Sequence, residues 1–243
     1  YFGKTSSMFQ AAGMASAIVG GFIATWSFVF LMWLSVIPQI FNLILSFQVI
    51  EPQKRSGTGN IYSHLGESIK YFLKNRKLRM LSLTSILGHS TGEASYQFQA
   101  AFFNTLVPLW AVGVAKTMSS LGGALSFYFG GKIVDKIKPI RLFVIGNLFS
   151  RVTNFTSLIF PSVFSPFIMS LNSLFFGATT VAREHLLQKE FAETQRATMG
   201  SLNSLMSSIF FAIFSFGIGL FADRFGGANA LIAINIIQLG ILY

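Results

Sequence analysis

The stretch "SFVFLMWLSVIPQIFNLILSFQVI", residues 27–50, contains no charged side chain. About 20 apolar residues in a helix cross the hydrocarbon core of a membrane, so this stretch predicts a transmembrane span. The whole chain agrees: 11% of its 243 residues are charged and 52% are hydrophobic, with a mean hydropathy of +0.61. Soluble domains carry about 25% charged residues. We therefore interpret the chain as an all-α, polytopic membrane protein rather than a soluble protein with an unusually apolar core.

Apolar length and helix-breaking residues predict eight spans along the chain. Between the second and third spans lies the longest loop, residues 51–79. Its segment "NIYSHLGESIKYFLKN", residues 60–75, has apolar side chains at helical spacing and lysines on the other face. This pattern predicts an amphipathic helix on the membrane surface, with a solvated linker as the alternative. The expected spans are 7–24, 27–50, 80–106, 117–134, 140–160, 164–187, 197–221 and one that begins at 228.

The basic residues predict the orientation of these spans. When the loops are assigned alternately to two sides, 15 of the 18 Lys and Arg residues fall on one side. Lys116 and Arg224 fall on the other side, and Arg151 lies inside a span. The positive-inside rule places the basic loops, around 51–79, 132–139 and 188–196, in the cytoplasm. The net charge of +10 is thereby explained without a nucleic-acid partner.

The order of these parts resembles the major facilitator superfamily of secondary transporters, whose twelve helices form two halves joined by a long cytoplasmic loop. On this mapping the chain begins before helix 5 and breaks off in helix 12, so helices 1–4 are absent. Residues 1–50 would be the last two helices of the N-terminal half. Residues 51–79 would be the loop between the halves, and residues 80–243 the six-helix C-terminal half with its last helix truncated.

The motif "GGKIVDKIKPIR", residues 130–141, carries most of this resemblance. The family signature has the form G-x-x-x-D-[RK]-x-G-[RK]-[RK]; Gly131, Asp135 and Lys136 match it, and its basic pair is reduced to Arg141. The resemblance implies a gating loop at a tight helix exit, with Asp135 facing the start of the first helix at residues 5–7. An ordinary charged loop is the alternative.

Two further motifs are similar to the family, and one departs from it. The start of "QRATMGSLNSL", residues 195–205, resembles the opening of helix 11, and "GLFADRFG", residues 219–226, is interpreted as an outer turn. The stretch "SAIVGG", residues 16–21, replaces the Gly-Pro of many proton-coupled drug exporters by Ser16-Ala17. Drug export is therefore not supported by this motif.

The polar stretch "GHSTGEASYQFQ", residues 88–99, interrupts the third span. His89, Glu93 and Gln97 share one helix face, and Tyr96 lies beside them. Glu93 follows the start of the span by roughly 20 Å at 1.5 Å per residue, which is deep in the membrane. A carboxylate there is costly unless it faces protein or water. We expect it to carry a proton, because burial favours the neutral form, or to balance a cationic substrate. A dry His89–Glu93 hydrogen bond is the alternative.

Two other groups of charged residues are candidates. Arg151 shares a face with Asn147 and Asn154, which predicts a bridge to a neighbouring helix or an ion pair used in coupling. Arg183 and Glu184 predict an inner gate cluster with Lys189 and Glu190, with snorkelling interface charges as the alternative.

The resemblance implies a secondary active transporter that moves a small solute by alternating access, and we expect a proton to be the coupling ion. It would act as a monomer in the cell membrane, as a multi-pass protein in contact with lipid, and without a cofactor. A metal site is not expected, because the three histidines lack metal-binding spacing, and no enzyme motif is found. The alternative is a polytopic receptor or scaffold that transports nothing, in which the Glu93 face packs dry.

Overall fold

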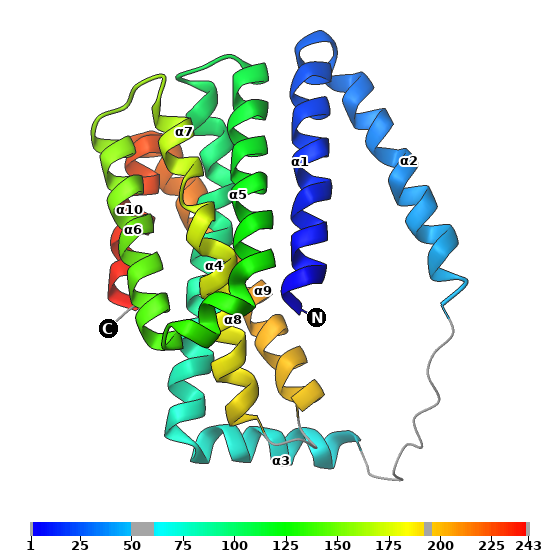
Figure 1. Ribbon diagram of the computed structural model, residues 1–243, viewed down its shortest axis with the longest axis vertical. Coiled ribbons are helices and arrows are strands. Elements are labelled where there is room, and N and C mark those ends of the chain that lie inside the picture. The colour runs from blue at the N-terminus through cyan, green and yellow to red at the C-terminus, as the bar shows by residue number, and fades with distance from the viewer. Residues whose placement is uncertain (1, 50–60, 192–195, 242–243) are drawn as a thin grey trace.

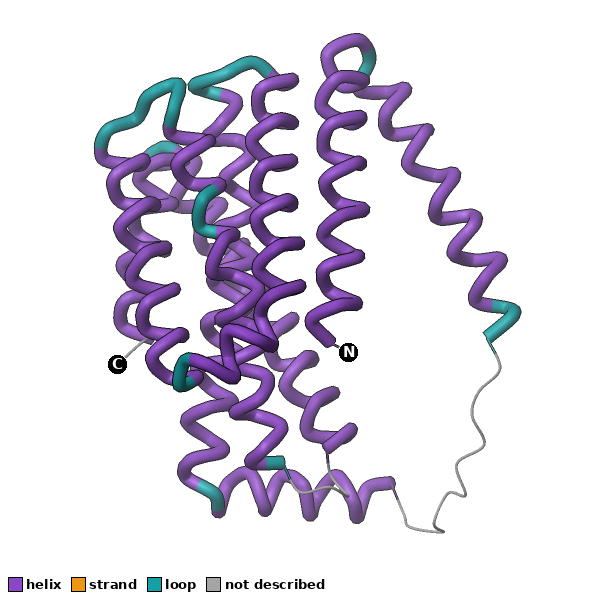
Figure 2. Tube along the Cα trace, in the orientation of Figure 1, coloured by secondary structure: helices purple, strands orange, loops and turns teal. Residues whose placement is uncertain are grey.

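The computed structural model describes residues 2–49, 61–191 and 196–241, and within these ranges it contains helices and loops but no strand (Figure 2). The predicted all-α class is confirmed. Successive long helices run in alternating directions between two ends of a bundle (Figure 1). The helices are α1 Phe2–Trp26, α2 Phe28–Ser46, α3 Ile61–Lys74, α4 Arg76–Asn104, α5 Leu109–Lys136, α6 Pro139–Ile159, α7 Ser165–Ser170, α8 Ser173–Glu190, α9 Arg196–Phe225 and α10 Gly227–Ile241.

Four of the described helices, α1, α2, α6 and α9, are long and apolar enough to cross a membrane. Their surfaces are compatible with membrane association, because large apolar side chains such as Trp33 and Phe216 are exposed on them. The other predicted spans also lie in helices. However, α4 is interrupted by polar residues and is less apolar than the four candidate spans. Helix α10 is apolar but has only 15 described residues, fewer than a span needs.

Two predicted boundaries are wrong. Helix α5 begins at Leu109, directly after Pro108, whereas the span was expected to start at 117. Lys116 therefore lies two turns inside a helix and not in an outer loop. The span expected at 164–187 is divided into α7 and α8, with a tight turn at Leu171 and Asn172.

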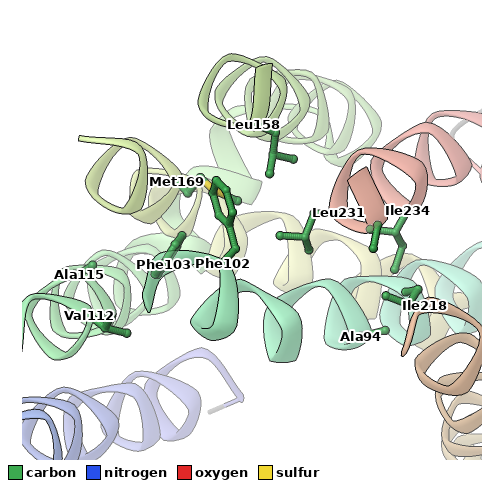
Figure 3. Close-up of a cluster of buried hydrophobic side chains, with 11 residues drawn as sticks. Ala94, Phe102, Phe103, Val112, Ala115, Leu158, Met169, Ile218, Leu231 and Ile234 are labelled. Carbon is green, nitrogen blue, oxygen red and sulfur yellow. The ribbon is translucent and has the colours of Figure 1, made fainter. Parts of the chain in front are cut away.

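An apolar core joins the C-terminal helices (Figure 3). Phe102 and Phe103 of α4 point toward Met169 of α7 and Leu158 of α6, and Leu231 of α10 lies in the same cluster. These side chains are almost fully buried. The core fixes α4, α6 and α10 around the polar groups described below.

Helix α1 packs lengthwise against α5, which belongs to the C-terminal part of the chain (Figure 1). The Ser7 hydroxyl donates a hydrogen bond to the Ala124 carbonyl at 2.8 Å. Near the other end, a Cβ added to Gly21 would lie 2.8 Å from the Gly113 Cα, so the two backbones touch there. Glycines and other small residues allow such close crossings in membrane proteins.

Helix α3 lies across one end of the bundle, as the amphipathic pattern of residues 60–75 predicted (Figure 1). The Tyr71 hydroxyl donates to the Glu190 carbonyl at 3.2 Å, and Tyr71 and Phe72 pack against a cluster that includes Leu78 and Leu187. This contact ties α3 to α4 and α8. Its position on a membrane surface stays a prediction.

Candidate functional site

A cavity of about 890 Å³ lies inside the bundle and is lined by residues of α1, α4, α5, α6, α7, α8 and α10. Drug-sized ligands bind in cavities of about 300–1,000 Å³. Hydroxyl and amide side chains line much of it, among them Gln10, Ser120, Asn147 and Asn172. Its titratable lining residues are His89, Glu93, Tyr96, Arg151 and Arg183.

The structure brings three of the four predicted α4 residues to this cavity. His89, Glu93 and Tyr96 line it, whereas Gln97 does not. The Gln97 side chain instead donates its Nε2 hydrogen to Glu93 Oε1 at 2.9 Å. Within the described part of α4, His89 and Glu93 are not joined by a hydrogen bond. The alternative of a His89–Glu93 hydrogen bond inside the bundle is therefore not found.

Lys116 of α5 belongs to the same group, although the sequence placed it in an outer loop. Its Nζ lies 3.4 Å from the centre of the Tyr96 ring and donates to the Tyr96 carbonyl at 3.3 Å. It also lies within electrostatic range of Glu93. The missed signal is Pro108, because proline commonly marks the start of a helix and would have moved the start of the span back past Lys116.

Arg151 is held by two amide side chains of α10. It donates to Asn235 Oδ1 at 2.5 Å and also to Gln238 Oε1. Asn154 donates to the same Asn235 oxygen at 3.0 Å, and Asn172 at the α7–α8 turn donates to Asn154 at 2.6 Å. The expected bridge from Arg151 to a neighbouring helix is therefore present. Sequence spacing within α6 gave no indication of Asn235 and Gln238, because they lie more than 80 residues away.

The expected contact of Asp135 with residues 5–7 is not made. Ser7 meets Ala124, and a Cβ on Gly3 would lie 2.7 Å from the Phe127 carbonyl oxygen. Asp135 lies two turns beyond Phe127 along α5. Because α1 and α5 are antiparallel, that direction leads away from residues 5–7.

The other residues of the predicted gating loop are exposed. Gly131 has open space around its Cα, and α5 continues past it to Lys136, so Gly131 marks no helix exit. The close packing occurs one residue earlier, where a Cβ on Gly130 would lie 3.2 Å from Val181 Cγ2. Asp135, Lys136 and Arg141 are exposed and make no ion pair with a described residue.

The predicted charge cluster at the end of α8 does not form as one unit. Glu190 pairs with Lys77 at the start of α4. Arg183 lies almost two turns earlier and lines the cavity, and Glu184 is not among the lining residues. The two side chains share a face of α8, but seven residues separate their Cα atoms by about 10 Å along the helix axis, so they meet different neighbours.

A comparison of the chain with models of known protein families gives no match. A comparison with curated proteins gives no match either.

Proposed function

We propose that the protein is a secondary transporter of the major facilitator type, which moves a small solute across the cell membrane by alternating access. In this proposal the basic loops 51–79, 132–139 and 188–196 are cytoplasmic, and proton movement through Glu93 drives the solute. The resemblance of residues 130–141 to the family signature supports the type of transporter. The alternating helix directions support the assignment of loops to two sides (Figure 1).

The observation that carries the proposal is a cavity within the bundle whose lining includes ionisable side chains. Glu93 faces a space of about 890 Å³ together with His89 and Arg183, whereas the outer surfaces of α1, α2 and α9 are apolar. Ionisable side chains are costly within a membrane and mark solute or proton pathways there. A receptor or scaffold would hold such a cavity open to one side only, whereas a transporter exposes it to both sides in turn.

The absence of cysteine in the sequence allows a direct test by single-cysteine labelling. Gly92 lines the cavity, whereas Ser90 of the same helix is fully buried and donates to the Ser207 carbonyl. In the full-length protein we expect Gly92→Cys to react with a membrane-impermeant maleimide from both sides of sealed vesicles. Ser90→Cys is the matched control and should react from neither side.

The outcome separates transport from the alternative. Alternating access exposes one cavity to the two sides in turn, so labelling of Gly92→Cys from one side should fall when labelling from the other rises. Reaction from a single side under all conditions would identify a receptor or scaffold with a fixed cavity, and would contradict the transport proposal.

A further inference from the structure

We infer that the cavity binds an anionic solute, carrying a carboxylate or phosphate group, through Arg183 and Arg151. This inference rests on the proposed function, because it names the class of solute that the same cavity carries. It replaces the expectation that Glu93 balances a cationic substrate.

Arg183 has no partner among the described residues. Its Nε is buried without a hydrogen bond, and it forms no ion pair within 4 Å. Glu184, the next residue, lies within electrostatic range but outside the cavity lining. A guanidinium has five donors in a planar fork, which suits the oxygens of a carboxylate or a phosphate. A buried cation with empty donors is costly, and an anion in the cavity would satisfy it.

Arg151 is paired with amide groups rather than with a carboxylate among the described residues. Its two partners, Asn235 and Gln238, are uncharged amides that orient the guanidinium without cancelling its charge. Its Nε is likewise buried without a partner. No ion pair joins Arg151 to any of the described carboxylates.

The two arginines flank one segment of the cavity. Helices α6 and α8 meet where Gly146 packs against Thr179, so closely that a Cβ on Gly146 would clash with Thr179 Cγ2. Helices α6 and α8 run in opposite directions (Figure 1). Arg151 lies five residues after Gly146 on α6, and Arg183 lies four residues after Thr179 on α8, so the two arginines lie on opposite sides of this contact. At 1.5 Å per residue their Cα atoms are separated by roughly 13 Å along the helix axes. Long side chains from both ends therefore reach a small organic anion between them.

The rest of the lining favours the same sign of charge. Glu93 is the sole carboxylate among the described lining residues, against the guanidinium groups of Arg151 and Arg183. Glu93 also has a cation of its own nearby, because Lys116 lies within electrostatic range of it. The cavity is therefore net positive, which repels a cationic solute and attracts an anionic one.

The test measures the thermal unfolding midpoint of the full-length protein, purified in detergent without added anionic lipid. The probes are sodium succinate, sodium phosphate and choline chloride at millimolar concentration and constant ionic strength. We expect succinate or phosphate to raise the midpoint by about 2–4 °C, and choline to leave it unchanged. The two anions distinguish a carboxylate from a phosphate ligand.

Variants assign the effect to the cavity. Arg183→Gln should abolish the rise, and Arg183→Lys should retain part of it, because a lysine keeps the charge without the planar fork. Arg151→Lys should likewise weaken it. The control is Arg224→Gln, since Arg224 is exposed at the end of α9 and should leave the rise intact. The lysine variants keep the test valid if Arg183→Gln fails to fold.

Two results would overturn the inference: a rise with choline, or no rise with either anion in the folded wild-type protein. A rise that survives both Arg183→Lys and Arg183→Gln would also contradict it. Uptake of labelled succinate, phosphate and choline into proteoliposomes separates this inference from the proposed function. Transport of choline alone would support the transporter proposal and contradict the anion site. Arg183-dependent anion binding without any transport would support the anion site and contradict the transporter proposal.

Discussion

The bundle contains two groups of polar side chains that are held in opposite ways. The amide group, Arg151, Asn154, Asn172, Asn235 and Gln238, joins α6, the α7–α8 turn and α10 by hydrogen bonds between side chains. The α4 group, His89, Glu93, Tyr96 and Gln97, has one such bond, from Gln97 to Glu93 within the same helix. Asn235 is 0% exposed, whereas Tyr96 is 44% exposed.

This difference separates a fixed part of the site from an adaptable part. A buried network of several side-chain hydrogen bonds resists rearrangement, because each broken bond leaves a buried polar group unpaired. An exposed group with one intrahelical bond changes its partners at little cost. We therefore expect the amide group to control stability and the α4 group to control proton coupling.

The largest effect on stability should come from Asn235→Leu. The change removes the acceptor shared by Arg151 and Asn154, so we expect the free energy of unfolding to fall by about 2–3 kcal/mol. Thermal unfolding in detergent measures it. Asn229→Leu is the control on the same helix, because Asn229 is exposed and bonds only to the Phe225 carbonyl. Equal losses in both variants would show that the amide group is not a fixed network.

A loss of coupling with unchanged stability should follow from Glu93→Gln. Glutamine keeps the size of the side chain but carries no titratable proton, so proton-driven solute uptake in vesicles should fall by about tenfold or more, or about 1.4 kcal/mol. The free energy of unfolding should change by no more than about 0.5 kcal/mol, which is typical of a surface substitution. Unchanged proton-driven uptake would remove Glu93 from the coupling step.

The smallest effect should come from the contact between Lys116 and Tyr96. Tyr96→Leu removes the ring beneath the ammonium group and should lower stability by about 0.5–1 kcal/mol, whereas Tyr96→Phe keeps the ring face and should be nearly neutral. Chemical denaturation in detergent measures both. If phenylalanine costs as much as leucine, the hydroxyl rather than the ring holds Lys116, and the α4 group is less adaptable than proposed.

Most of the fold could be predicted because apolar length and basic loops are local properties of the sequence. The first two spans, the amphipathic segment at 60–75 and the turn at Gly226 were all predicted, and Gly226 has the positive φ of 86° that such a turn favours. The turn at Leu171 and Asn172 was missed. Asn172 in this turn donates a hydrogen bond to Asn154, which lies on another helix.

The candidate site was predicted only in part, because helical spacing gives the face of one helix and not what lies opposite it. It grouped His89, Glu93 and Gln97, of which Gln97 turns out to lie outside the cavity lining. It drew attention to Arg151 but not to Asn235, and it placed Arg183 with Glu190 rather than in the cavity. Each of these errors concerns a contact between distant segments.

The contact between Gly21 and Gly113 has a consequence for the cavity. Ser7 is bonded to Ala124 near one end, and the glycine backbones touch near the other, so α1 and α5 stay in contact over most of their length. The helix that α1 contacts so closely also carries the Lys116 ammonium group, which lies over the Tyr96 ring. Helix α5 thus contributes both to the cavity lining and to the cation beside Glu93, and α1 packs along that same helix.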